Sequence, residues 1–157
     1  MKLTLLTGLA VALLLTACGR SSGTTGGLAE FDRDGFEARL DESELPVIVN
    51  VWGSWCPPCR SEAPLFATAH QQFGDRIEFI GVDVQDTQEG AAGFIADYGI
   101  EFENLFDRTG EIRQMMGGIG APITYFIAPG GGLVDTHIGV IDEQQLALGI
   151  DELLAQG

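Results

Sequence analysis

Basic residues are scarce in this chain. It carries eight lysines and arginines against 23 aspartates and glutamates, a formal net charge of −15 in 157 residues, and Lys2 is its only lysine. A protein this acidic is repelled by phosphate backbones and by anionic lipid surfaces. The sequence therefore predicts no nucleic-acid partner, and the excess of acid is typical of a well-solvated surface.

Cysteine is also rare, with three residues at positions 18, 56 and 59. A structural zinc site generally needs four ligands, and the chain has no second CxxC pair and no histidine spaced to complete one. No metal site is predicted. A purely structural disulfide across so small a loop would add little stability. A redox-active pair at Cys56 and Cys59 is the remaining interpretation.

Only one apolar run, residues 3–15, stands out, and it is short for a membrane span. It follows Lys2 and ends in small residues, as a secretory signal does. Its end, Leu15-Thr16-Ala17-Cys18, resembles the bacterial lipobox, which implies lipid attachment at Cys18. We therefore predict a signal peptide over residues 1–17 and a flexible Gly/Ser/Thr tether over 18–27. Removal of residues 1–17 would leave seven arginines against 23 acidic residues, a net charge of −16.

Residues 28–157 read as one globular domain in which helices and strands alternate. Strands joined through helices should be parallel, and a late hairpin should add an antiparallel edge. Asp142 is expected to cap the last helix. The predicted helices cover 32–40, 57–73, 90–98, 111–116 and 143–154, and the predicted extended segments cover 47–52, 77–84, 102–106, 123–128 and 133–140.

Three stretches carry a resemblance to a known family: VIVNVWGSWCPPCRSEAP, FIGVDVQD and GAPITYFIAPGG, which span most of residues 47–132. In this order and spacing they resemble the TlpA/ResA/CcmG-like thiol-disulfide oxidoreductases, which are bacterial and act outside the cytoplasm. The resemblance implies a thioredoxin-like α/β fold, with a central mixed sheet of about four to five strands and helices on both faces. Two departures bear on the client protein: the chain lacks the β-hairpin that many members carry before the first helix, and it has Ala121 where a larger residue is common.

The CPPC motif should place Cys56 at a helix N-terminus, where unpaired backbone N–H groups and the helix dipole stabilise a thiolate. Cys56 is expected to be reachable by other proteins and to attack or be attacked. Cys59, one turn later and more buried, would resolve the mixed disulfide. The dithiol would need no further cofactor.

Other site residues follow from the resemblance. It implies a cis peptide bond before Pro122, with Ala121 offering backbone groups to a substrate strand and Trp55 forming an apolar platform beside Cys56. Asp86 matches an acidic position of ResA-like proteins and is the candidate proton relay for Cys59, since a buried acid near a thiol can take a proton. Asp83 is a competitor for this role, and Glu62 is interpreted as support for the helix end.

The sequence therefore predicts a membrane-tethered, extracytoplasmic disulfide reductase. The resemblance implies protein substrates, with apocytochrome c as a client class, and a membrane thiol as electron donor. Two alternatives stay open: a dithiol oxidase of the same fold, and a copper-binding or chaperone module that uses the two thiolates.

Overall fold

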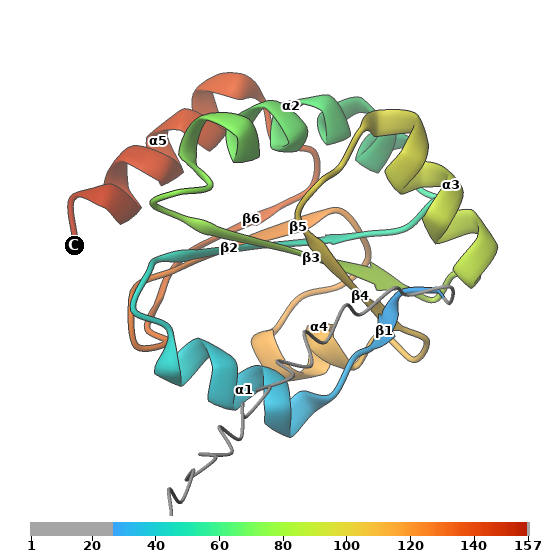
Figure 1. Ribbon diagram of the computed structural model, residues 1–157, viewed down its shortest axis with the longest axis horizontal. Coiled ribbons are helices and arrows are strands. Elements are labelled where there is room, and N and C mark those ends of the chain that lie inside the picture. The colour runs from blue at the N-terminus through green and yellow to red at the C-terminus, as the bar shows by residue number, and fades with distance from the viewer. Residues whose placement is uncertain (1–26, 157) are drawn as a thin grey trace, which may run out of the picture.

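The computed structural model describes residues 27–156, which form a six-stranded sheet between two layers of helices (Figure 1). The predicted signal peptide, nearly all of the tether and the lipid-attachment residue Cys18 lie outside the described residues. Among residues 27–156, no helix is long and apolar enough to cross a membrane. The strands are β1 (Ala29–Glu30), β2 (Val47–Trp52), β3 (Glu78–Val84), β4 (Glu103–Asp107), β5 (Ile123–Ile127) and β6 (Leu133–Ile138), and the helices are α1 (Arg33–Glu42), α2 (Pro57–Phe73), α3 (Gln88–Tyr98), α4 (Glu111–Met116) and α5 (Glu143–Leu154).

The strand order is β1-β4-β3-β2-β5-β6. The strands β1, β4, β3 and β2 run parallel, and β5 pairs antiparallel with β2 and with β6. This arrangement confirms the predicted thioredoxin-like fold and its late hairpin. The predicted number of strands was too low, because β1 has only two residues and exists through its pairing with β4.

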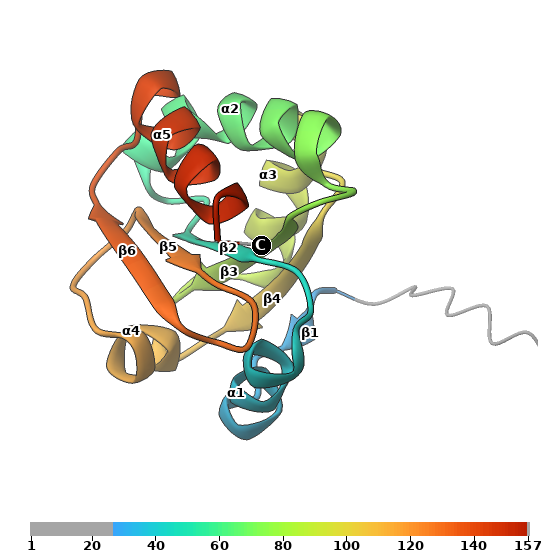
Figure 2. The ribbon, with the colours of Figure 1, turned by 90° about the vertical axis from the view of Figure 1, so that its left-hand side faces the viewer.

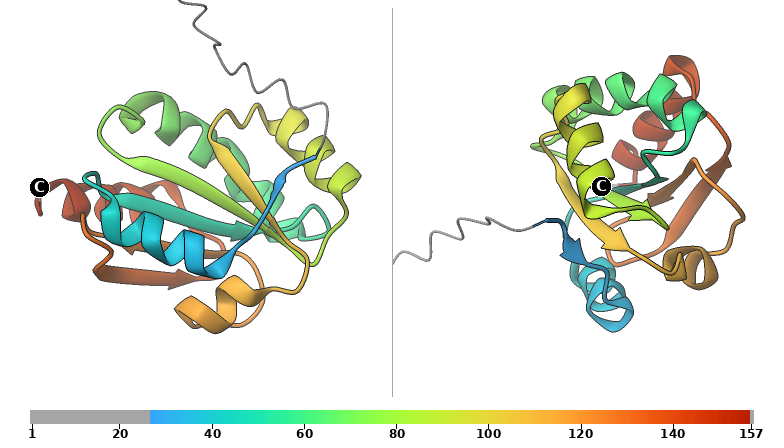
Figure 3. Two further views of the ribbon diagram at one scale, coloured as in Figure 1. Left: turned by 60° about the horizontal axis from the view of Figure 1, so that its bottom comes forward. Right: turned by 90° about the vertical axis from the view of Figure 1, so that its right-hand side faces the viewer.

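Two apolar layers follow from the alternation of side chains along the strands. In β2, Ile48 and Trp52 join a buried cluster beneath α2, α3 and α5, whereas Val47, Val49 and Val51 face the layer of α1 and α4. Figures 2 and 3 show these helices on opposite faces of the sheet. All six residues of β2 are buried, as expected for a central strand with helices on both sides.

Side-chain caps fix several helix ends. Asp142 caps α5 and forms a capping box with Gln145, which confirms the predicted start. Asp32 caps α1, so this helix begins one residue later than predicted, and Thr87 caps α3, which begins two residues earlier. The predicted strand 133–140 ends early at Ile138 because Gly139 adopts a positive φ of 97° and donates its N–H to Pro122.

Candidate active site

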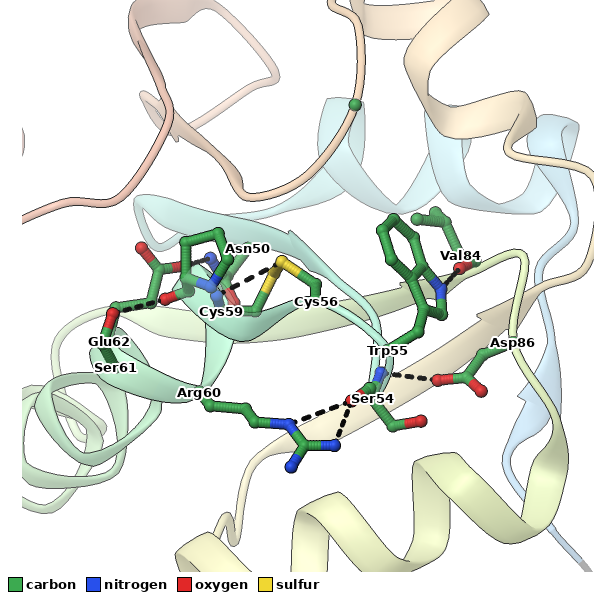
Figure 4. Close-up of a disulfide and its surroundings, with 12 residues drawn as sticks. Asn50, Ser54, Trp55, Cys56, Cys59, Arg60, Ser61, Glu62, Val84 and Asp86 are labelled. Atoms are coloured by element: carbon green, nitrogen blue, oxygen red, sulfur yellow. Dashed lines mark hydrogen bonds between the residues drawn. A yellow bond between two sulfur atoms is a disulfide. The ribbon is translucent and has the colours of Figure 1, made fainter.

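The CPPC motif lies where β2 ends and α2 begins. Cys56 is the N-cap residue of α2, and its sulfur accepts a hydrogen bond from the backbone N–H of Cys59 at 3.2 Å. Pro57 and Pro58 follow in the first turn, where the N–H groups that prolines lack would have no partner in the helix. Cys56 and Cys59 form a disulfide with their Cα atoms 5.3 Å apart. Cys56 therefore lies at the N-terminus of α2, as the sequence predicts (Figure 4).

Both cysteines are buried, each with 1% of its surface exposed. The expectation that Cys56 is reachable was therefore wrong for the disulfide form described here. The residues around it are different: Trp55, Pro57 and Pro58 are all exposed. Exposed residues thus flank the two buried sulfurs on the chain, and we call Trp55, Pro57 and Pro58 the rim of the site.

Trp55 forms one side of this rim. Its side chain is 49% exposed, and its indole Nε1–H donates to the carbonyl oxygen of Val84 at 3.0 Å (Figure 4). Gly53 leaves room for the ring, because a Cβ there would lie 2.5 Å from the indole nitrogen. The structure fixes the place of Trp55, and its role as a platform for substrate stays a prediction.

The segment before β5 forms the facing side. The Ala121–Pro122 peptide bond is cis, as the family resemblance implies. Pairing of Val51 with Ile123 brings Pro122 to the same end of the sheet as the CPPC motif. Ala121 is half-buried against the apolar cluster that contains both cysteines. Its contact with a substrate strand stays a prediction.

Asp86, the predicted proton relay, is placed poorly for that role. It accepts hydrogen bonds from the backbone N–H groups of Ser54 (2.5 Å) and Thr87 (2.7 Å). Partial burial opposes its ionisation, but the hydrogen bonds from Ser54 and Thr87 hold its pKa below the ordinary value. Figure 4 shows Asp86 beside Ser54 and apart from the two sulfurs. A carboxylate stabilised in this way is a weak base.

Glu62 is the buried acid near Cys59 that the sequence led us to expect at Asp86. It lies one helical turn after Cys59 on α2, is 1% exposed, and accepts hydrogen bonds from Asn50 Nδ2 and from the N–H of Ile141, both at 2.9 Å. Burial raises its pKa to about 7, although both hydrogen bonds and His137 favour the charged form. From the sequence, Glu62 was expected only to support the helix end. Its i,i+3 spacing from Cys59 was the signal that could have singled it out.

A second buried carboxyl lies on β3. Asp83 is fully buried, and neither of its carboxyl oxygens has a hydrogen-bond partner among the described residues. Burial, followed by the charges of Asp86 and Asp107, raises its pKa to about 8. Two buried carboxyl groups, Glu62 on α2 and Asp83 on β3, therefore have pKa values raised toward neutral pH. Elsewhere in residues 27–156, as here, no three His, Cys, Asp or Glu side chains gather closely enough to hold a metal ion.

Comparison with known proteins gives consistent results. Residues 28–136 match the AhpC/TSA family. The chain is 36% identical over 126 residues to the thiol:disulfide interchange protein HelX of Rhodobacter capsulatus, covering 77% of this chain and 70% of HelX. It is 28% identical to the thiol-disulfide oxidoreductase ResA of Bacillus subtilis, covering 69% of this chain and 63% of ResA. The crystal structure of a DsbF homologue from Corynebacterium diphtheriae is similar with a TM-score of 0.67 at 28% identity, covering 73% of this chain and 76% of that one.

Proposed function

The chain belongs to the AhpC/TSA family, and on that premise we propose that it is a membrane-tethered protein disulfide reductase that acts outside the cytoplasm. Its general activity is that of a thiol-disulfide oxidoreductase of the ResA and DsbE type. The observation that carries the proposal is the Cys56–Cys59 disulfide at the start of α2, at the same end of the sheet as the cis peptide bond before Pro122. No other cofactor enters the proposed reaction.

The reaction is two successive thiol-disulfide exchanges. The thiolate of reduced Cys56 attacks one sulfur of a client disulfide, forms a mixed disulfide, and expels the other client sulfur as a thiolate, which takes up a proton. The Cys59 thiolate then attacks Cys56, closes the Cys56–Cys59 disulfide, and releases the second client thiol. Two electrons pass from the dithiol to the client. A dithiol donor in the membrane returns them by the same steps in reverse.

Cys59 must lose its proton before it can attack. We propose that Glu62 accepts this proton, because it lies one turn away on the same buried face of α2 and its pKa of about 7 matches neutral pH. Asp86 is a weaker candidate because hydrogen bonds hold it in the charged form. Asp83 has a suitable pKa but lies on β3, on the strand that supports Trp55 through Val84.

The client, the donor and the membrane anchor are supported less directly. The predicted signal peptide and the lipobox-like sequence at Cys18 support tethering and an extracytoplasmic location, and the similarity to HelX, ResA and DsbE supports a protein client. Within that class, the family resemblance favours apocytochrome c. The charge of −16 expected after removal of residues 1–17 favours clients with a basic surface around the disulfide.

A trapping experiment tests the proposal. Cys59→Ala should leave Cys56 joined to its client in a mixed disulfide that mass spectrometry can identify, and Cys56→Ala is the matched control, which should trap nothing. A measured reduction potential decides the direction of electron flow. A value near the strongly oxidising end, about −120 mV, would exclude the reductase and favour the oxidase. If Cys56→Ser retained full function in cells, both redox functions would be excluded. Copper titration of the reduced protein tests the copper-binding alternative separately.

A further inference from the structure

One arginine joins the loop after β3 to the segment before β5. Arg113 lies on α4, on the opposite face of the sheet from α2. Its Nη1 donates to the carbonyl oxygen of Gly120 at 3.2 Å, and its Nη2 donates to Oε1 of Gln85 at 2.7 Å. The guanidinium thus connects two loops that are 35 residues apart in sequence.

Each contact lies next to a part of the site. Gly120 directly precedes the cis Ala121–Pro122 bond. Gln85 directly follows Val84, whose carbonyl oxygen holds the indole of Trp55. The Arg113 bridge, defined as these two hydrogen bonds, therefore links the loop on one side of Cys56 to the support of Trp55 on the other.

The backbone around Arg113 is shaped for this bridge. Gln85 has a φ of 53°, the only positive φ of a residue other than glycine among those described. Such a conformation is strained for a residue with a side chain and persists only where the surroundings enforce it. Gly110 makes the space on the other side, since a Cβ there would lie 2.2 Å from Nη2 of Arg113.

A second contact holds the other end of the same loop. The hydroxyl of Tyr125 donates to the carbonyl oxygen of Gly117. Between these two anchored carbonyls, at Gly117 and Gly120, lies Ile119, whose side chain is 91% exposed. The loop is therefore fixed at both ends while it presents an apolar side chain to solvent.

We propose that Arg113 is a positioning residue that sets the spacing between the Pro122 loop and Trp55, and thereby allows an extended disulfide-bearing peptide to be held over Cys56. This inference rests on the proposed function. The planar fork of arginine donates to two acceptors at once in fixed directions, which a lysine ammonium on its flexible stem does not reproduce. Arg113 should therefore affect the rate with peptide substrates, while the sulfur chemistry itself does not require it.

The first experiment compares two substrates. The reduced full-length protein reacts with a synthetic disulfide-bonded peptide and, separately, with bis(2-hydroxyethyl) disulfide, which is too small to span both loops. For Arg113→Met, the ratio of the peptide rate constant to the small-disulfide rate constant should fall about tenfold, the effect of losing roughly one charged hydrogen bond. Arg76→Met, the same change at an exposed residue just beyond the C-terminus of α2, should leave the ratio within about twofold, because surface changes away from such contacts have small effects. Arg113→Lys should fall between the two.

The second experiment does not depend on activity. The chain has two tryptophans, Trp52 and Trp55, which can be labelled with 5-fluorotryptophan and followed by ¹⁹F NMR. In Arg113→Met the Trp55 resonance should shift or broaden while that of buried Trp52 stays in place. Gln85→Ala should have a similar effect, and the double variant should add little to either single one, because both remove the same contact.

The outcomes separate this inference from the proposed function. A wild-type protein that reduces neither disulfide contradicts the proposed function, while the ¹⁹F spectra still test the bridge. An active wild-type protein whose peptide ratio is unchanged in Arg113→Met, or an unmoved Trp55 resonance in that variant, overturns the inference. Equal losses on both substrates would do the same, since they would indicate a general structural defect.

Discussion

The buried carboxyl of Asp83 should make this protein less stable as the pH rises. On β3 it lies between Trp52 of β2 and Phe106 of β4, without contact with solvent. Burial and two neighbouring aspartates raise its pKa from 3.8 to about 8, so it is protonated in the folded protein at pH 7 and ionised in the unfolded chain. Between about pH 4 and pH 8 the folded state therefore binds the extra proton, and the free energy of unfolding falls as the pH increases.

The size of this effect follows from the pKa values. From 3.8 to pH 7 is about three units, and each unit corresponds to 1.36 kcal/mol, so the cost at pH 7 relative to pH 4 is at most about 4 kcal/mol. An amide cannot ionise. Asp83→Asn should therefore remove this pH dependence. Between pH 4 and pH 7, its free energy of unfolding should rise relative to that of the wild type by up to about 4 kcal/mol. Glu62, which also titrates in this range, is present in both proteins, and its contribution cancels in the comparison.

Urea unfolding of the oxidised protein at half-unit steps from pH 4 to pH 8 measures the effect. Asp97→Asn, the same change at an exposed position of α3, is the matched control and should run parallel to the wild type. If the curves of Asp83→Asn and the wild type are also parallel, Asp83 is ionised in the folded protein and the reasoning fails.

Three further predictions test other parts of the structure. Glu62→Gln should slow the resolution of a mixed disulfide by Cys59 about 100-fold at pH 7, which is the scale of general-base catalysis. It should also remove the inflection near pH 7 from the pH dependence of the resolution rate, measured by stopped-flow fluorescence. An unchanged pH profile would exclude Glu62 as the base. Ile119→Ser should leave the free energy of unfolding within about 0.5 kcal/mol of the wild type, because the side chain contacts solvent. If this exposed apolar side chain contacts the client, the same change should raise KM for a disulfide peptide, and equal KM values would show that it does not. Phe94→Ala should cost about 3 to 5 kcal/mol in urea unfolding, because the buried ring stacks on Trp52 with centroids 4.2 Å apart; a cost under 1 kcal/mol would show that the cavity collapses.

Features encoded by neighbouring residues could be predicted from the sequence. The apolar run that forms β2, the CPPC start of α2 and the Asp142 cap of α5 each depend on residues within a few positions of one another. The two-residue strand β1 could not be found in this way, since it is defined by the partner strand β4, more than 70 residues later.

The acid–base groups of the site were hidden for the same reason. Glu62 accepts a hydrogen bond from the backbone N–H of Ile141, which is 79 residues away in sequence. The raised pKa of Asp83 depends on its burial between β2 and β4. The Arg113 bridge needs Gln85 and Gly120 to be neighbours, which only the assembled sheet ensures. Asp86 was the more visible candidate because it follows a strand in a matching position, but its hydrogen bonds with Ser54 and Thr87 could not be read from spacing.

Burial of both sulfurs affects which reductants can exchange electrons with this protein. Because each sulfur is only 1% exposed in the disulfide form, a partner that displaces the neighbouring residues should reduce it faster than a small dissolved thiol at the same concentration. The oxidised pair can then remain out of equilibrium with the surrounding small thiols. Its redox state would depend on the protein partner with which it last exchanged electrons.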